Sequence, residues 1–327
     1  MSVKFKKLAI ATAVGASLGF AGMAQANNSL LFPYITTSAT AYTFVSLFND
    51  PDPLNAGSGG AGFGHDAVGY HFYYGYKAVG AAATAACTHR DFPVDVTEGA
   101  LLQFEVGYKL DLPTEFGDPV SYGATLRLEN NRLPANSEGF LIVTVPAPVA
   151  AEVARGEAAV IDTATGLALT YTANSVPNVI GDFSGTGNVE HVTSWYPRNV
   201  VTTSWYALPV GTLAQMTPNS GGGIFGRILP NTDADNQGAY GRAENYTSGS
   251  VPNNLRCFGT FTVDNLLTAP FNQGGWMSIV SLTSNTANVF TNVAPDDVIA
   301  DDILLYKRQQ TSAVGSSLDM IQPEVAR

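Results

Sequence analysis

The sequence predicts an all-β fold of one or more antiparallel β-sandwiches, with long loops and one or two short helices. Apolar and polar residues alternate with a period of two in many short runs, which is typical of half-buried strands. These runs are rich in Val, Ile, Thr and aromatic residues, and Gly, Pro, Asn and Asp separate them. Hydrophobic residues make up 45% of the chain, so it can bury a sizeable core.

The clearest strand is predicted between Leu102 and Asp111. One face of this run carries Leu102, Phe104, Val106, Tyr108 and Leu110, and the other carries Gln103, Glu105, Gly107, Lys109 and Asp111. We expect the first face on the core and the second in water. Less strict runs predict further strands at 42–48, 68–77, 140–145, 167–172, 200–208, 258–263, 276–283 and 303–307.

Helix signals are few. Pro148 suits a first helical turn and Gly156 suits the position past a helix end, so residues 148–155 are predicted as two turns of helix. A second short helix is predicted at 296–302. The loops are predicted at 49–66, 174–190 and 215–256, and loops of this length are usually functional or disordered.

Residues 1–26 have the three parts of a secretory signal peptide. Three lysines come first, an apolar run follows from Leu8 to Met23, and Ala24-Gln25-Ala26 matches a cleavage site. The apolar run is shorter than the ~20 residues that a membrane-spanning helix needs. We therefore expect export to the periplasm, the cell surface or the medium, and no transmembrane helix. The β-sandwich domain or domains then span 27–308, and 309–327 form a polar C-terminal tail.

The charge balance excludes one class of partner. Residues 27–327 keep 13 basic and 27 acidic side chains, which is a net charge of −14. A nucleic-acid-binding protein needs a basic surface, so we expect no nucleic-acid partner.

The two cysteines, Cys87 and Cys257, predict a disulfide bond, because an exported chain folds in an oxidising compartment. The alternative is a metal site that combines Cys87 with His89 and His71.

Residues 233–244 resemble an EF-hand calcium loop. Asp233 and Asp235 occupy positions one and three, Gln237 stands where Asp or Asn is usual, and Glu244 occupies position twelve. These four residues are the candidate ligands of a structural calcium ion, and no other cofactor is expected. The alternative is an acidic surface loop, and the flanking residues do not look helical.

Four aromatic side chains share one face of a predicted strand: Tyr70, Phe72, Tyr74 and Tyr76. Exposed, they would form a platform on which sugar rings stack. Buried, they would be core, which is the more common place for such residues.

The segment 29–35 is apolar and follows directly after the predicted cleavage site. It either pairs within its own sheet or adds as a donor strand to a second copy of the chain, which would make the protein a homo-polymer. Pro33 lacks an N–H and favours an edge position.

Three patches carry a family resemblance: Ser29-Leu30-Leu31-Phe32-Pro33-Tyr34, Phe44-Val45-Ser46-Leu47, and Cys87 with Phe104-Glu105-Val106. Together they resemble a group of uncharacterised exported β-rich proteins of environmental Gram-negative bacteria. The resemblance implies export and a β-rich fold, and no activity or catalytic residues.

The sequence therefore favours a non-enzymatic exported protein, a structural or adhesive component of the cell surface or the medium. The second hypothesis is a periplasmic or secreted module that binds a glycan or small ligand. A hydrolase is the third, with a catalytic triad assembled only in space.

Overall fold

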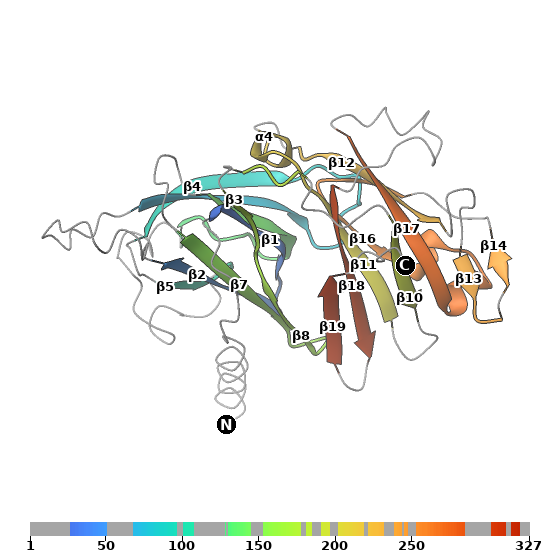
Figure 1. Cartoon of the computed structure of the whole chain (residues 1–327). Coiled ribbons are helices and arrows are strands. Elements are labelled where there is room, and N and C mark those ends of the chain that lie inside the picture. The colour runs from blue at the N-terminus through green and yellow to red at the C-terminus, as the bar shows by residue number, and fades with distance from the viewer. Residues whose placement is uncertain are drawn as a thin grey trace, which may run out of the picture.

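The structure is a computed structural model, and most of the residues it describes lie in β-strands (Figure 1). It describes residues 27–50, 68–96, 101–107, 128, 130–144, 153–177, 181–184, 191–196, 202–218, 222–231, 239–243, 245–247, 253–284, 302–311 and 315–320. The strands within these ranges form three sheets, and antiparallel pairing dominates all three. The predicted all-β class is confirmed.

The first sheet has five strands in the order β4-β3-β6-β1-β9. Their bounds are β1 Asn27–Thr37, β3 Val68–Ala78, β4 Thr88–Val96, β6 Ser137–Thr144 and β9 Asn174–Pro177. Strand β1 pairs with β6 on one side and with β9 on the other, and its register shifts between Phe32 and Ile35. Pro33 lies at this irregularity and beyond Leu31, where the pairing of β1 with β9 ends, and both positions tolerate a missing N–H.

The second sheet has eight strands in the order β16-β11-β18-β19-β8-β7-β2-β5. Their bounds are β2 Ala41–Asp50, β5 Leu101–Glu105, β7 Val153–Asp162, β8 Leu167–Thr172, β11 Thr202–Pro209, β16 Gly259–Thr262, β18 Ile303–Thr311 and β19 Gly315–Met320. Strands β19 and β8 run parallel and share one register pair, Ser316 with Leu167. The sheet thus joins an N-terminal group of strands to a C-terminal group.

The third sheet has six strands in the order β14-β13-β17-β12-β15, and β10 also pairs with β17. Their bounds are β10 His191–Tyr196, β12 Phe225–Asn231, β13 Ala239–Gly241, β14 Tyr246–Thr247, β15 Asn253–Arg256 and β17 Gly275–Ser284. Short helices α4 Leu213–Met216 and α5 Val263–Leu266 and the 3-10 turn η1 Phe271–Gln273 connect strands of this half.

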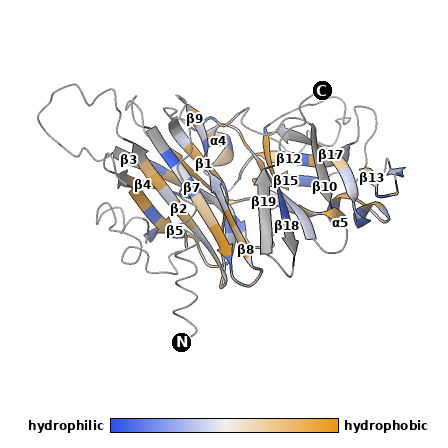
Figure 2. Cartoon of the chain, turned by 60° about the horizontal axis from the view of Figure 1, so that its bottom comes forward, coloured by the Kyte–Doolittle hydropathy of each residue, from blue (hydrophilic) through white to orange (hydrophobic). Residues whose placement is uncertain are grey.

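Three clusters of buried side chains lie between these sheets. The first core joins β3 and β4 to β2 and β5, and the third joins β11 and β18 to β12 and β17. The second core lies in the middle and contains side chains from both halves, among them Ile142, Phe140, Tyr206 and Leu304. In Figure 1 the strands β1–β7 occupy the left half and β10–β18 the right half, and Figure 2 shows apolar colour along much of β2 and along parts of β4 and β7.

Strands β1 and β6 are buried on both faces. Leu30 and Phe32 face the first core, whereas Leu31 and Tyr34 face the second. This explains why residues 29–35 and 139–143 are continuous apolar runs, since a strand between two cores has no side that favours polar residues.

Several predicted boundaries are wrong. Residues 153–155, expected in a helix, begin β7, where pairing with β2 overrides a weak local preference. The predicted loop 215–256 contains β12, β13, β14 and β15, the predicted loop 174–190 begins with β9, and the predicted tail contains the end of β18 and all of β19. The helix predicted at 296–302 lies outside the described residues, apart from Asp302.

The predicted strand 102–111 ends earlier than expected, at Glu105. Leu102, Phe104 and Val106 are buried as predicted, but Glu105, which was expected in water, is fully buried too. Residues 108–111 of the predicted strand lie outside the described part of the chain. No helix among the described residues is long and apolar enough to cross a membrane.

Candidate functional site

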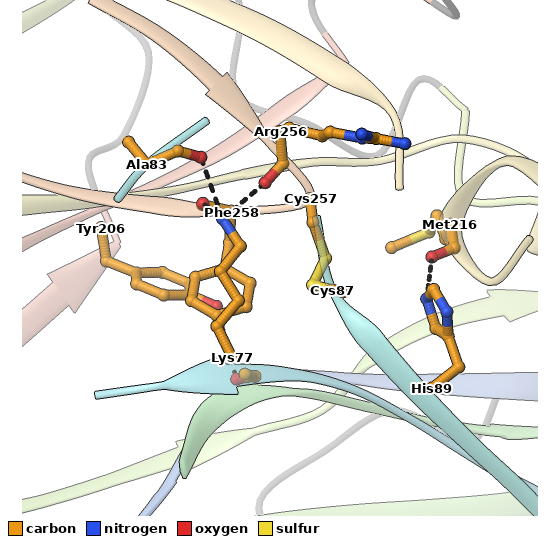
Figure 3. Close-up of a disulfide and its surroundings, with 10 residues drawn as sticks. Lys77, Ala83, Cys87, His89, Tyr206, Met216, Arg256, Cys257 and Phe258 are labelled. Atoms are coloured by element: carbon orange, nitrogen blue, oxygen red, sulfur yellow. Dashed lines mark hydrogen bonds between the residues drawn. A yellow bond between two sulfur atoms is a disulfide. The ribbon is translucent and has the colours of Figure 1, made fainter. Parts of the chain in front are cut away.

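A disulfide bond links the two halves of the protein (Figure 3). Cys87 precedes β4 of the first sheet, and Cys257 lies between β15 and β16; their Cα atoms are 6.0 Å apart across a sequence separation of 170. Both side chains are buried in the second core. The predicted disulfide is confirmed, and the alternative metal site at Cys87 is wrong because its sulfur is bonded to Cys257.

The ammonium group of Lys77 lies beside this disulfide, at the end of β3. It donates hydrogen bonds to three backbone carbonyls: Ala83 at 2.9 Å, Arg256 at 2.7 Å and Phe258 at 2.8 Å. It also lies 4.7 Å from the centroid of the Phe258 ring. All three N–H groups of a charged lysine therefore have an acceptor, which is what a buried ammonium requires.

Lys77 has an altered affinity for its proton. Burial lowers its pKa from 10.5 to about 8, the Arg256 guanidinium acts in the same direction, and the Glu138 carboxylate opposes both. Burial in turn raises the pKa of Glu138. Lys77 is thus mostly charged at pH 7, and its charge is held inside the protein.

Backbone hydrogen bonds surround the same point. Arg256 N donates to Ala83 O at 2.9 Å, Cys87 N donates to Gly222 O at 3.1 Å, and Cys257 N donates to Ile224 O at 2.9 Å. We call the disulfide, the Lys77 ammonium and these bonds the joint. It connects residues 77–87 of the N-terminal half to Gly222 and residues 256–258 of the C-terminal half, and the Cys257–Ile224 bond holds Cys257 within its own half.

His89 lies next to the joint, on β4. Its Nε2 is 3.1 Å from the carbonyl of Met216 at the end of α4. Burial lowers the pKa of His89, while the Met216 carbonyl and Asp91 oppose this. His71, the other member of the proposed metal set, instead stacks on Tyr73 with the ring centroids 6.1 Å apart. Within the described ranges, no three His, Cys, Asp or Glu side chains are placed to hold a metal ion.

The predicted aromatic stripe is core. Tyr70, Phe72 and Tyr74 are at most 1% exposed and Tyr76 is 8% exposed, and all four belong to the first core. Phe72 packs on Phe92 and Phe104, with ring centroids 5.6 and 5.9 Å apart. Stacking on a sugar needs an exposed ring, so the interpretation of these four residues as a ligand-binding platform is wrong.

A second group of aromatic residues lies on the six-stranded sheet. Tyr246 of β14 is the register partner of Tyr240 of β13, which is in turn the partner of Trp276 of β17. The rings of Tyr240 and Trp276 stack at 4.8 Å with 15° between their planes, and those of Tyr240 and Tyr246 lie 5.4 Å apart at 51°. We call Tyr246, Tyr240 and Trp276 the aromatic row.

The aromatic row was missed because two of its residues lie in a segment predicted as loop, where no alternation marks a strand. Lys77 was also missed, since one lysine at a strand end gives no signal of burial. In both cases the role is visible only in the contacts that the folded chain makes, Tyr240 with Trp276 and Lys77 with Arg256 and Phe258.

The calcium prediction stays untested by this structure. Asp233, Asp235, Gln237 and Glu244 all lie outside the described residues.

Segment 29–35 pairs within its own chain. Strand β1 is bonded to β6 over 29–37 and to β9 over 27–31, and Gly181 N donates to the Ser29 hydroxyl at 2.8 Å. A homo-polymer through these residues stays a prediction, and it requires β1 to leave both neighbours.

Comparisons with known proteins give no relative: no family model, no curated protein and no solved structure matches the chain. The resemblance to exported β-rich proteins of Gram-negative bacteria therefore stays a prediction. The disulfide is compatible with an oxidising compartment.

Proposed function

We propose that the chain is an exported, non-enzymatic β protein that serves as a structural or adhesive component of the cell surface or the extracellular space. The observation that carries the proposal is the joint. A cystine, a buried ammonium and backbone bonds tie segments of both halves together at one point. The signal-peptide pattern of residues 1–26 and the acidic composition agree with export from the cytoplasm.

The joint supports a mechanical role because it changes how the chain carries tension. When the ends are pulled apart, the cystine keeps the residues between Cys87 and Cys257 from extending, across a separation of 170 residues. A fully extended segment of that length spans about 600 Å. A chain that anchors cells or forms a matrix gains resistance to pulling from such a link.

Single-molecule pulling tests this step. We expect the reduced protein to extend by about 600 Å more than the oxidised protein, following the length per extended residue. Equal extension in both states would contradict the mechanical argument.

Localisation and size test the role itself. Antibodies against the folded domain should label intact producing cells or their medium, and the secreted protein should self-associate or bind to surfaces. A strictly monomeric periplasmic protein with neither property would refute the proposal. Turnover in a broad panel of hydrolase substrates would refute its non-enzymatic part.

A secreted or periplasmic module that binds a glycan or a small ligand is the second candidate. The aromatic row favours it, because its outermost ring, Tyr246, is 39% exposed.

A further inference from the structure

We propose that the aromatic row is a binding site for neutral sugar rings on the outer face of the six-stranded sheet. The proposal rests on the second candidate function and deepens it by naming the ligand class. It also moves the predicted glycan site from β3, where the rings are core, to the opposite end of the protein, where β13 and β14 lie (Figure 1).

The alternation along two strands places the row on the outer face. Met277 and Ile279 of β17 are fully buried in the third core, and Ala239 of β13 is too. Trp276 and Tyr240 are their neighbours in sequence, so their side chains point to the other face of the sheet. Neither belongs to a buried core cluster, and both are partly exposed.

The row crosses three adjacent strands at one register level. Residues directly opposite each other in a ladder share a face, so Tyr246 lies on the same face as Tyr240 and Trp276. Beyond β17, Trp195 of β10 holds the register position opposite Trp276.

A purely structural role explains one part of the row. Cross-strand aromatic pairs stabilise a sheet, and the nearly parallel stack of Tyr240 on Trp276 is such a pair. It does not explain Tyr246, which sits on a two-residue strand, is tilted by 51° from Tyr240 and is 39% exposed. A tilted ring at the end of the stack offers a face to a ligand.

The chemistry of the row matches a sugar ring. A pyranose has an apolar C–H face and a polar rim of hydroxyls, and tyrosine likewise combines an apolar ring with one polar end. Ligand sites typically combine aromatic surface with a few polar groups that orient the ligand. Arg242 and Asn245, both exposed, lie in the turn between β13 and β14 and supply donors for hydroxyl groups.

The charge of the protein selects among sugars. With a net charge of −14 over residues 27–327, the protein repels polyanions, and like-charge repulsion acts against acidic partners. We therefore assign the row to neutral glycans and not to polyuronates.

Calorimetric titration of the full mature chain with three hexasaccharides tests the proposal: cellohexaose, N-acetylchitohexaose and hexagalacturonate. We expect at least one neutral hexamer to bind and hexagalacturonate not to bind. Tyr246→Ala should weaken binding by at least about tenfold, a loss of ~1.4 kcal/mol. Tyr246→Phe, which keeps the ring, should stay within about threefold of the wild type, which corresponds to less than ~1 kcal/mol.

Leu101→Ala is the matched control. Leu101 is 41% exposed on β5, in the other half of the protein, so its removal deletes a comparable exposed side chain far from the row. Binding should be unchanged in this variant, and the unfolding transition of Tyr246→Ala should match that of Leu101→Ala.

Three results would overturn the proposal: no binding of either neutral hexamer, binding of hexagalacturonate alone, or equal affinity of Tyr246→Ala and the wild type. None of them bears on the joint, so the structural function can survive the loss of this site. Conversely, a failed pulling or localisation experiment leaves the aromatic row untouched.

Discussion

Removing the disulfide should cost the protein a large part of its stability. The double variant Cys87→Ala, Cys257→Ala opens a loop that spans a sequence separation of 170. The chain-entropy relation for a loop of this size gives about 5 kcal/mol at 25 °C, an upper figure because residual structure in the unfolded chain reduces it. A domain is typically stable by only ~5–15 kcal/mol, so the variant should be marginal or unfolded at 37 °C.

Urea denaturation followed by tryptophan fluorescence measures this loss. The wild type and the double variant should differ by roughly 3–5 kcal/mol in the free energy of unfolding. Thr84→Ala is a suitable control, because Thr84 is exposed in the same connection between β3 and β4. Its free energy of unfolding should stay within about 0.5 kcal/mol of the wild type.

A double-mutant cycle with Lys77→Met tests whether the joint acts as a unit. Two of the three carbonyls bound by Lys77 belong to the residues on either side of Cys257, so loss of the cystine should loosen its hydrogen bonds. Lys77→Met should therefore cost less in the cystine-free background, with a coupling energy of about 0.5–3 kcal/mol. A loss of less than ~1 kcal/mol on removing the cystine would refute the entropic argument, and zero coupling would refute the description of the joint as one unit.

The remaining predictions concern three side chains, Lys77, His89 and Phe72. Lys77→Met in the oxidised protein should lower the free energy of unfolding by ~1.5–3 kcal/mol, because three carbonyls lose a hydrogen bond to a charged group, although Ala83 O and Arg256 O each keep a backbone N–H donor. Burial lowers the pKa of Lys77 to about 8 in the folded protein, whereas the unfolded chain keeps the proton up to pH 10.5. Between these pH values the unfolded state binds more protons, so the free energy of unfolding of the wild type should rise with pH relative to that of Lys77→Met. If the difference between the two proteins in urea denaturation did not change with pH, this would be contradicted. Burial also lowers the pKa of His89, so the unfolding free energy should fall as the pH drops below ~6.5, and His89→Gln should abolish that fall in thermal melts at matched pH. Phe72→Ala should lower the free energy of unfolding by ~3–5 kcal/mol because it leaves a cavity in the first core, whereas Leu101→Ala should change it little. Equal losses for the two variants in chemical denaturation would mean that the aromatic stripe is not core.

Alternation predicted the strands that are half-buried and fairly long. Leu167–Thr172 is β8 with the predicted bounds, because one face meets the core and the other meets water along the whole strand. The same signal fails for β13 and β14, with only three and two residues, because a period of two cannot be recognised over so short a run. It also fails at Glu105, whose burial depends on what covers β5 and not on its own position in the pattern.

The sequence by itself determined the all-β class, the cystine and the apolar character of β1 and β6, because strand periodicity, cysteine count and continuous apolar runs are local properties of the chain. Only the tertiary structure decided that Tyr70, Phe72, Tyr74 and Tyr76 are core, that Lys77 is buried on three carbonyls and that Tyr240 meets Tyr246 and Trp276. Exposure and contact depend on which distant segment covers a residue, and an alternating pattern has the same form whether its apolar face meets a core or a ligand.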